Sequence, residues 1–262
     1  MSTLLTIERM VAEDEGEGDA VVCIHGLGGS ANTFGPLLPA LQRHRVLRPD
    51  LPGSGRSQRA EGALSIGRYV DAVQAFCDRA GIARAHVVGH SMGTIVAQHL
   101  AVRNPKLVRS LALFGPLITP PDPARKAMRS RADKAREGAA GLHEIVDQLT
   151  QVAVSSETRQ NHPLAVAFVR ESLLRQEPEA YARSCEALAG AEAAVVDRIA
   201  CPVLLVTGDE DGVAPPQNVR AMAEKIAGAR ALVLPRCGHW TPVEKPEDCQ
   251  RALRDFLASV RN

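Results

Sequence analysis

Ala85-His86-Val87-Val88-Gly89-His90-Ser91-Met92-Gly93 joins a short apolar run to the pattern Gly-x-Ser-x-Gly. If Ser91 lies in a sharp turn between a strand and a helix, its backbone is forced into an unfavourable φ/ψ region, and bulky residues two positions away would collide. Gly89 and Gly93 remove those side chains. The apolar, β-branched run before the pattern favours a strand, and residues 94–101 after it have helical spacing. The stretch therefore predicts a strand, a tight turn that carries a serine, and a helix.

The composition is that of an ordinary globular protein, and 262 residues suffice for one α/β domain with an insertion. The 31 basic and 30 acidic residues nearly balance, which argues against a nucleic-acid-binding surface. No stretch approaches the length of apolar sequence that a membrane span requires. The six cysteines lack the paired spacing of a zinc site and the chain shows no secretory leader. We therefore expect reduced thiols in a cytoplasmic protein, with no metal and no membrane contact.

Strand signals alternate with helix signals on both sides of the serine. Before it we expect an edge hairpin over residues 3–13, strands over 20–24 and from 46, and helices over 34–42 and 69–80. After it we expect strands over 107–114, 202–207 and 231–234, and helices near 217–227 and 246–260. This alternation predicts a mostly parallel, doubly wound sheet, with ligands bound at the carboxyl ends of its strands.

The composition changes after residue 114, where four prolines cluster and strand patterns disappear up to residue 195. Helical patterns are expected over residues 124–138, 141–153, 163–175 and 178–189. A helical insertion between two strands is most simply a cap over the active edge of the sheet. We therefore expect a core of residues 1–116 and 196–262, and a cap of residues 117–195.

Two loops after the insertion carry the groups that an activated serine requires. A serine hydroxyl is a poor nucleophile at neutral pH, so Ser91 needs a histidine base that is oriented by an acid. Asp209, Glu210 and Asp211 follow one predicted strand, and His239 follows the next. All of them therefore fall at carboxyl ends of strands, as Ser91 does. The residues alone leave the choice among the three acids open.

Together these motifs resemble the α/β-hydrolase superfamily over essentially the whole chain. The matching motifs are His25-Gly26-Leu27-Gly28-Gly29, Asp50-x-Pro52-Gly53-x-Gly55-x-Ser57, Gly89-His90-Ser91-Met92-Gly93, Gly208-x-x-Asp211-x-x-x-Pro215 and Gly238-His239. The branch of cap-bearing esterases, lactonases and C–C hydrolases is the most similar. The resemblance implies an α/β-hydrolase fold with an inserted helical cap.

The resemblance also implies a role for each site residue. Ser91 is the expected nucleophile, His239 the base and Asp211, three residues after a glycine, the acid. The backbone amides of Leu27 and Met92 are the expected oxyanion-hole donors. The implied reaction cleaves a small ester or lactone through an acyl-enzyme, and it requires neither a metal nor a cofactor.

Two parts of the sequence resemble different enzymes within this branch. Residues 25–30 and 174–181 are similar to those of 3-oxoadipate enol-lactonase-like enzymes, whereas Cys237-Gly238-His239-Trp240 resembles hydrolases that cleave C–C bonds in meta-cleavage products. Those C–C hydrolases usually carry Asn where this chain has His90, and a differently built oxyanion loop. We therefore expect ester or lactone hydrolysis, with cleavage of a vinylogous diketone acid as the alternative. A non-catalytic ligand-binding protein on the same fold is the third interpretation.

Residues beside the expected triad are candidates for substrate contact. His25, His90 and Trp240 either touch substrate or hold the loops in place. Six basic residues of the first cap helix could receive an anionic substrate, but interspersed acids favour a solvated helix face: Arg125, Lys126, Arg129, Arg131, Lys134 and Arg136. The expected partner is a small molecule, and both a monomer and a homo-oligomer are compatible with the sequence.

Overall fold

The strand that leads into Ser91 lies at the centre of the fold. In the computed structural model, which describes residues 2–57 and 62–260, all six residues of β5 (Ala85–His90) are buried. β5 pairs in parallel with β3 (Asp19–Ile24) on one side and with β6 (Val108–Phe114) on the other. The strands lie in the order β1-β2-β4-β3-β5-β6-β7-β8. The others are β1 (Thr3–Ile7), β2 (Met10–Glu15), β4 (His44–Pro49), β7 (Val203–Gly208) and β8 (Arg230–Leu234).

Only the first two strands of this sheet depart from parallel pairing. β1 and β2 form an antiparallel hairpin, and β2 pairs with β4 in the antiparallel sense. The pairs from β4 to β8 are all parallel. The mostly parallel sheet and the edge hairpin predicted from the sequence are thus confirmed. As a result, the carboxyl ends of β3, β5, β6, β7 and β8 meet at one edge.

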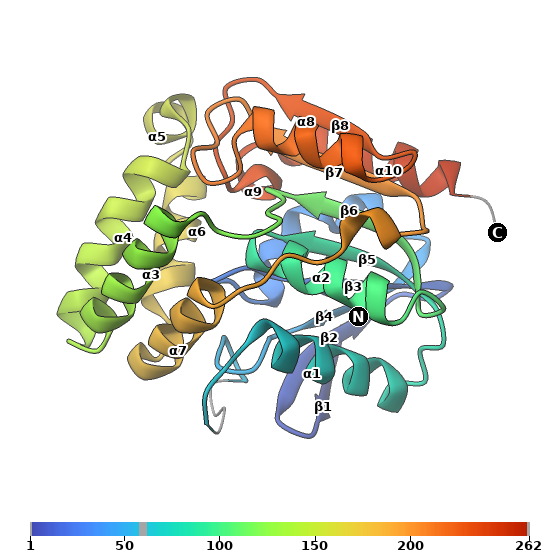
Figure 1. Ribbon diagram of the computed structural model, residues 1–262, viewed down its shortest axis with the longest axis horizontal. Helices are drawn as coiled ribbons and strands as arrows, with labels where there is room; N and C mark the ends of the chain where they lie inside the picture. The colour runs from blue at the N-terminus through green and yellow to red at the C-terminus, as the bar shows by residue number, and fades with distance from the viewer. Residues whose placement is uncertain (1, 58–61, 261–262) are drawn as a thin grey trace.

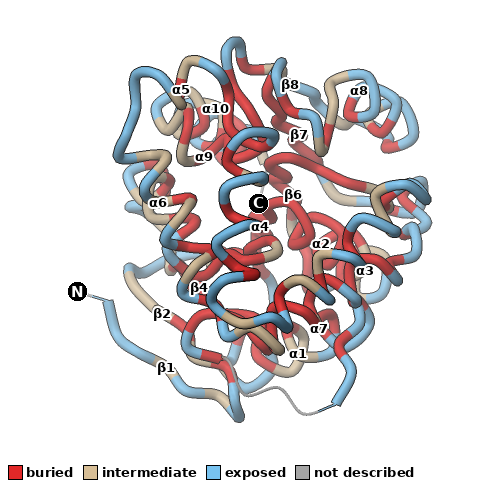
Figure 2. The backbone as a smooth tube through the Cα atoms, turned by 90° about the vertical axis from the view of Figure 1, so that its left-hand side faces the viewer, coloured by how far each residue is buried: buried red, intermediate tan, exposed pale blue. Residues whose placement is uncertain are grey.

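Helices cover both faces of the sheet and bury the central strands (Figures 1 and 2). α1 (Ile66–Arg79), α2 (Met92–Arg103) and α8 (Pro216–Lys225) pack on one face in a large apolar cluster. α10 (Pro246–Ser259) packs on the other face together with residues 31–40. This arrangement explains why the central strands read as continuous apolar runs rather than alternating ones.

The segment before β4 differs from the expectation of an ordinary helix over residues 34–42. It forms a 3-10 helix, η1 (Ala31–Ala40), which begins with a capping box between Ser30 and Thr33. Pro36 and Pro39 lie inside it, and proline removes the amide donors that an α-helix requires. The prolines therefore account for the tighter and earlier helix.

Five α-helices lie between β6 and β7 and form one layer at the side of the sheet (Figure 1). They are α3 (Asp122–Ala135), α4 (Ala139–Ala153), α5 (Ser156–Asn161), α6 (Pro163–Leu174) and α7 (Pro178–Ala189). Four correspond to predicted helices, and the short α5 was not expected. They have an apolar cluster of their own, which also contains Trp240 and contacts Leu27 from the loops of the sheet. This cluster fixes the inserted helices over the carboxyl ends of the strands.

Two further short helices complete the described chain. η2 (Val196–Arg198) leads from the inserted helices back to β7, and α9 (Thr241–Glu244) lies between β8 and α10. No helix in residues 2–57 and 62–260 is both long enough and apolar enough to cross a membrane.

Candidate functional site

Ser91 lies in the sharp turn that the sequence predicted between β5 and α2. Its backbone angles are φ 52° and ψ −123°, a conformation that is strained for a residue with a side chain. A Cβ atom at Gly93 would lie 2.0 Å from the carbonyl oxygen of Ile24, and one at Gly26 would lie 2.6 Å from the Cβ of Ser91. The loop after β3 therefore packs directly against the turn, and glycine is required on both sides of this contact.

A chain of two hydrogen bonds connects Ser91 to a histidine and an aspartate. The Nε2 atom of His239 lies 2.8 Å from the Oγ of Ser91. The Nδ1 atom of His239 lies 2.9 Å from Oδ2 and 3.1 Å from Oδ1 of Asp211. Because an ionised carboxylate only accepts, Nδ1 carries the proton and Nε2 is the acceptor for the serine hydroxyl. All three side chains are buried.

Backbone amides hold the Asp211 carboxylate in place. Oδ1 accepts hydrogen bonds from the amides of Val213 at 2.8 Å and Ala214 at 2.7 Å. Burial by itself raises the pKa of Asp211, but His239 and these hydrogen bonds outweigh it and hold the pKa below its ordinary value. Asp211 is therefore ionised at neutral pH.

The two neighbouring acids have other partners. Asp209 accepts a hydrogen bond from the amide of Cys237 at 3.1 Å, and Glu210 accepts one from the amide of Ser156 at 2.8 Å. The structure therefore brings Asp211, rather than either neighbour, to His239.

A buried glutamate that the sequence analysis did not single out fixes the loop around His239. Glu244 accepts hydrogen bonds from the amides of Gly238 and Trp240, both at 3.1 Å, so it holds the residues on either side of the histidine. It also accepts one from the amide of Ser155 at 2.8 Å, in the inserted helices. One carboxylate thus links this loop to the layer of inserted helices.

Replacing Glu244 with alanine is expected to leave these buried amide donors without partners. Each such donor costs about 1–3 kcal/mol, so we expect the free energy of unfolding to fall by about 3 kcal/mol or more. Displacement of His239 should lower kcat/KM by about 10- to 100-fold. Urea unfolding and ester hydrolysis measure the two effects, with Glu247→Ala as the control because Glu247 is exposed. Wild-type stability in the Glu244→Ala variant would contradict this role.

His90 lies between His239 and Trp240. Its Nε2 donates to the carbonyl oxygen of His239 at 3.0 Å, and its ring centroid lies 5.3 Å from that of His239 and 5.2 Å from that of Trp240. Burial, with a smaller contribution from His239, lowers the pKa of His90 to about 3. His90 is therefore neutral when the protein is folded, and its ring supports the backbone of His239.

This neutral His90 is expected to weaken the protein in acid. Its pKa is about 3 when folded and 6.5 ordinarily, so between these values the unfolded chain binds one more proton than the folded one. His90 therefore lowers the free energy of unfolding by about 1.4 kcal/mol for each pH unit that the pH falls within this window. The His90→Asn variant should show a pH dependence that is shallower by this amount, as measured by urea unfolding between pH 7 and about pH 4. An equal pH dependence in both proteins would contradict the assignment.

His25, the other candidate for substrate contact in the sequence analysis, uses both ring nitrogens within the loops. Nδ1 donates to the carbonyl oxygen of Gly26 at 2.8 Å, and Nε2 accepts from the amide of Leu51 at 2.9 Å. Burial lowers the pKa of His25, which is fully buried. The histidine thus joins the glycine-rich loop after β3 to the loop after β4, and no ring nitrogen remains for a ligand.

The two amides that resemblance assigned to the oxyanion hole have no acceptor among the residues that the structure describes. Neither the Leu27 amide nor the Met92 amide donates a hydrogen bond to any residue that the structure describes. Met92 is the first residue of α2, where the helix itself supplies no acceptor for the amide. Both donors are therefore available to a ligand.

A cavity of about 60 Å³ opens onto Ser91 and His239. His90, Arg131 and Tyr181 are the other polar residues that line it. The apolar lining comes from both the sheet loops and the inserted helices: Leu27, Leu117, Met128, Leu149, Ala153, Leu173, Leu188, Val213 and Trp240. Within the described chain, no three His, Cys, Asp or Glu side chains converge as a metal ion would require.

This geometry agrees with the chain's relatives. Residues 19–246 match the family of the alpha/beta hydrolase fold. The chain belongs to the α/β-hydrolase family. The 2-hydroxymuconate semialdehyde hydrolase of Pseudomonas putida is 31% identical over 268 residues, which cover 96% of this chain and 92% of that protein.

Solved α/β hydrolases superpose on almost the whole of this hydrolase. A malate-bound thermophilic esterase from Thermogutta terrifontis has a TM-score of 0.92 at 26% identity, and the match covers all of both chains. The enol-lactonase from Burkholderia xenovorans LB400 has a TM-score of 0.89 at 26% identity, over 98% of this chain and 100% of that one. The hydrolase is therefore similar to esterases, lactonases and enzymes of the meta-cleavage type.

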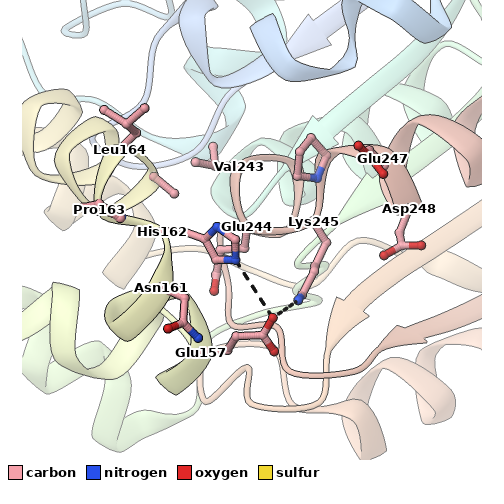
Figure 3. Close-up of a pocket in the computed structure, with 12 residues that line it drawn as sticks. Glu157, Asn161, His162, Pro163, Leu164, Val243, Glu244, Lys245, Glu247 and Asp248 are labelled. Carbon is pink, nitrogen blue, oxygen red and sulfur yellow. Dashed lines mark hydrogen bonds and ion pairs between the residues drawn. The ribbon is translucent and has the colours of Figure 1, made fainter.

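A larger groove of about 590 Å³ lies elsewhere on the hydrolase, between α5, α6 and residues 243–248. Figure 3 shows the Glu157 carboxylate between two side chains of this groove, with Lys245 Nζ at 3.1 Å and His162 Nε2 at 4.0 Å. Neither Ser91 nor His239 lines it. Despite its size, this groove lacks the reactive groups, so the smaller cavity is the candidate active site.

Proposed function

We propose that this protein is a serine hydrolase that cleaves a small carboxylic ester or lactone through an acyl-enzyme. The observation that supports this proposal most directly is the 2.8 Å contact between His239 Nε2 and Ser91 Oγ. The other ring nitrogen of His239, Nδ1, is hydrogen-bonded to Asp211. A base, its orienting acid and a nucleophile in hydrogen-bond contact are what acyl transfer to serine requires. An available pair of backbone amides beside Ser91 supports the same chemistry.

The first half of the proposed reaction acylates Ser91. His239 takes the hydroxyl proton on Nε2 while Oγ forms a bond to the carbonyl carbon. The carbonyl oxygen becomes negative and accepts hydrogen bonds from the Leu27 and Met92 amides, at about 2.7–4 kcal/mol of transition-state stabilisation for each donor. The bond to the alcohol oxygen then breaks, and His239 returns the proton to that oxygen. Asp211 stabilises the imidazolium that exists between these two transfers.

The second half releases the acid. His239 takes a proton from water, and the hydroxide attacks the acyl carbonyl with the same two amides as donors. The bond to Oγ breaks and Ser91 regains its proton from His239. We propose that residues 117–195 act as a cap that limits the access of bulk water, and that residues 1–116 and 196–262 form the catalytic core.

Cleavage of a C–C bond in a vinylogous diketone acid is the alternative function. The observation that favours it is the identity of 31% with 2-hydroxymuconate semialdehyde hydrolase, together with the Trp240 side chain in the cavity wall. Ester or lactone hydrolysis ranks first because the esterase and the enol-lactonase match nearly the full structure. A non-catalytic ligand receptor is disfavoured, because such a protein would not need the hydrogen-bonded Ser91, His239 and Asp211.

Three substrates separate these functions. Short p-nitrophenyl esters, an enol-lactone and a vinylogous diketone acid are offered to the wild-type protein under the same conditions. We expect hydrolysis of the ester or the lactone, with an initial burst of p-nitrophenol and an acyl group on the peptide that contains Ser91, detected by mass spectrometry. Turnover of the diketone acid alone would establish the alternative. Absence of turnover with all three would overturn the hydrolase proposal.

A further inference from the structure

The cavity that contains Ser91 also contains one unpaired cation. Arg131 of α3 is partly buried, lines the cavity, and makes no ion pair with any carboxylate of the described residues. Three other cations of the same helix have partners. Arg125 donates hydrogen bonds to the carbonyl oxygens of Ala189 and Ala191. Lys134 forms ion pairs with Glu137 and Glu144, and Arg136 forms ion pairs with Glu179 and Glu186. Arg131 therefore differs from the solvated helix face that the sequence favoured.

A tyrosine hydroxyl beside this cation is also without a partner. Tyr181 of α7 is only 1% exposed and lines the same cavity, and its hydroxyl lies beside Arg131 and Cys185 but makes no well-aligned hydrogen bond with any residue that the structure describes. Burial raises the pKa of Tyr181, with the neighbouring Cys185 adding to it, and the nearby charge of Arg131 acts in the opposite direction. The hydroxyl is therefore a neutral donor. A buried polar group without a partner is uncommon and is costly in the absence of a ligand.

The other residues that line the Ser91 cavity limit the chemical class of ligand that it can bind. None of the described lining residues is acidic, and apart from the reacting groups and His90 the wall is apolar. A guanidinium and a hydroxyl that both donate form a complementary site for an anion, and a planar carboxylate suits the fork of an arginine. Because Ser91 opens onto the same small cavity, the anion and the reacting carbonyl belong to one short molecule.

We propose that Arg131 and Tyr181 bind a carboxylate on the acyl part of the substrate, so that the hydrolase acts on a small ester or lactone with a free carboxylate. This inference rests on the proposed function and names its substrate class. The carboxylate replaces the solvent around Arg131 and gives the Tyr181 hydroxyl an acceptor. The apolar residues between the two ends of the cavity contact the short chain that joins carboxylate and carbonyl.

A matched pair of substrates tests the proposal. The first is p-nitrophenyl hydrogen glutarate, which carries a carboxylate, and the second is its neutral methyl ester. Wild-type kcat/KM should be higher for the charged substrate by about 10-fold or more. Arg131→Met should lower kcat/KM for the charged substrate by about 10- to 100-fold, chiefly through KM, and change that of the neutral ester by less than about 3-fold. Arg129→Met is the control, because Arg129 is exposed on the same helix and does not line the cavity.

Tyr181→Phe is the second variant and removes only one oxygen atom. It should lower kcat/KM for the charged substrate alone, by about 3- to 10-fold. If Arg131→Met fails to fold, this variant tests the carboxylate site on its own. Equal kcat/KM for both substrates in the wild type, or equal losses on both substrates in the variants, would overturn the carboxylate site while the hydrolase proposal stands. Failure of the wild type to hydrolyse either ester would overturn both.

Discussion

Ser91→Ala is expected to lower kcat for p-nitrophenyl ester hydrolysis by about 10⁶-fold, because it removes the atom on which the acyl-enzyme forms. The hydroxyl is bonded at 2.8 Å to His239, and alanine leaves that base with nothing to deprotonate except water. The Leu27 and Met92 amides remain, so a rate of about 10³- to 10⁴-fold above the uncatalysed one is expected to persist. Initial rates at high enzyme concentration measure this residual activity.

The same position provides a control for folding. Alanine has a Cβ, as serine does, so it inherits the strained φ of 52° without adding to the strain. Glycine tolerates this backbone conformation. Ser91→Gly should therefore be as inactive as Ser91→Ala, but its free energy of unfolding should be about 1 kcal/mol higher than that of Ser91→Ala. Such a result separates loss of the nucleophile from loss of structure. If Ser91→Ala kept more than about a hundredth of wild-type kcat, Ser91 would not be the nucleophile.

The elements that carry the site were predictable from sequence because each depends on local signals. Ser91, Asp211 and His239 each follow a short apolar run, and the carboxyl ends of parallel strands meet at one edge of a sheet. No long-range information was needed to place them together. The choice of Asp211 over Asp209 and Glu210 came only from resemblance, because all three acids occupy the same loop. The structure separates them by their amide partners.

Two features depend on contacts between distant segments: Glu244, which the sequence did not identify, and the difference between Arg131 and the other five cations that the sequence considered with it. Glu244 bonds to Ser155, 89 positions earlier in the chain, and it lies in α9, a helix of four residues with too little periodicity to be predicted. Arg131 has the same sequence environment as the other cations of α3. Arg131 makes no ion pair with a described residue because of which side chains α4 and α7 bring against α3, and no pattern within α3 records that packing.

The backbone around Asp211 leads us to expect a large loss of kcat in the Asp211→Asn variant. Oδ1 accepts from the amides of Val213 and Ala214, so an asparagine must place its carbonyl oxygen there. Its NH₂ group then occupies the position of Oδ2, 2.9 Å from Nδ1 of His239. Because NH₂ only donates, it favours the histidine tautomer that has its proton on Nε2.

In that tautomer Nε2 points a hydrogen at Ser91 and cannot take the hydroxyl proton, so kcat at neutral pH is expected to fall by about 10⁴-fold. The matched control is Asp209→Asn, whose carboxylate bonds to the amide of Cys237 rather than to His239. It should change kcat by less than about 10-fold. The comparison uses the ester chosen for Ser91→Ala, with urea unfolding to show that both variants are folded. Equal losses in the two variants would mean that general disturbance of the loop, rather than the tautomer of His239, sets the rate.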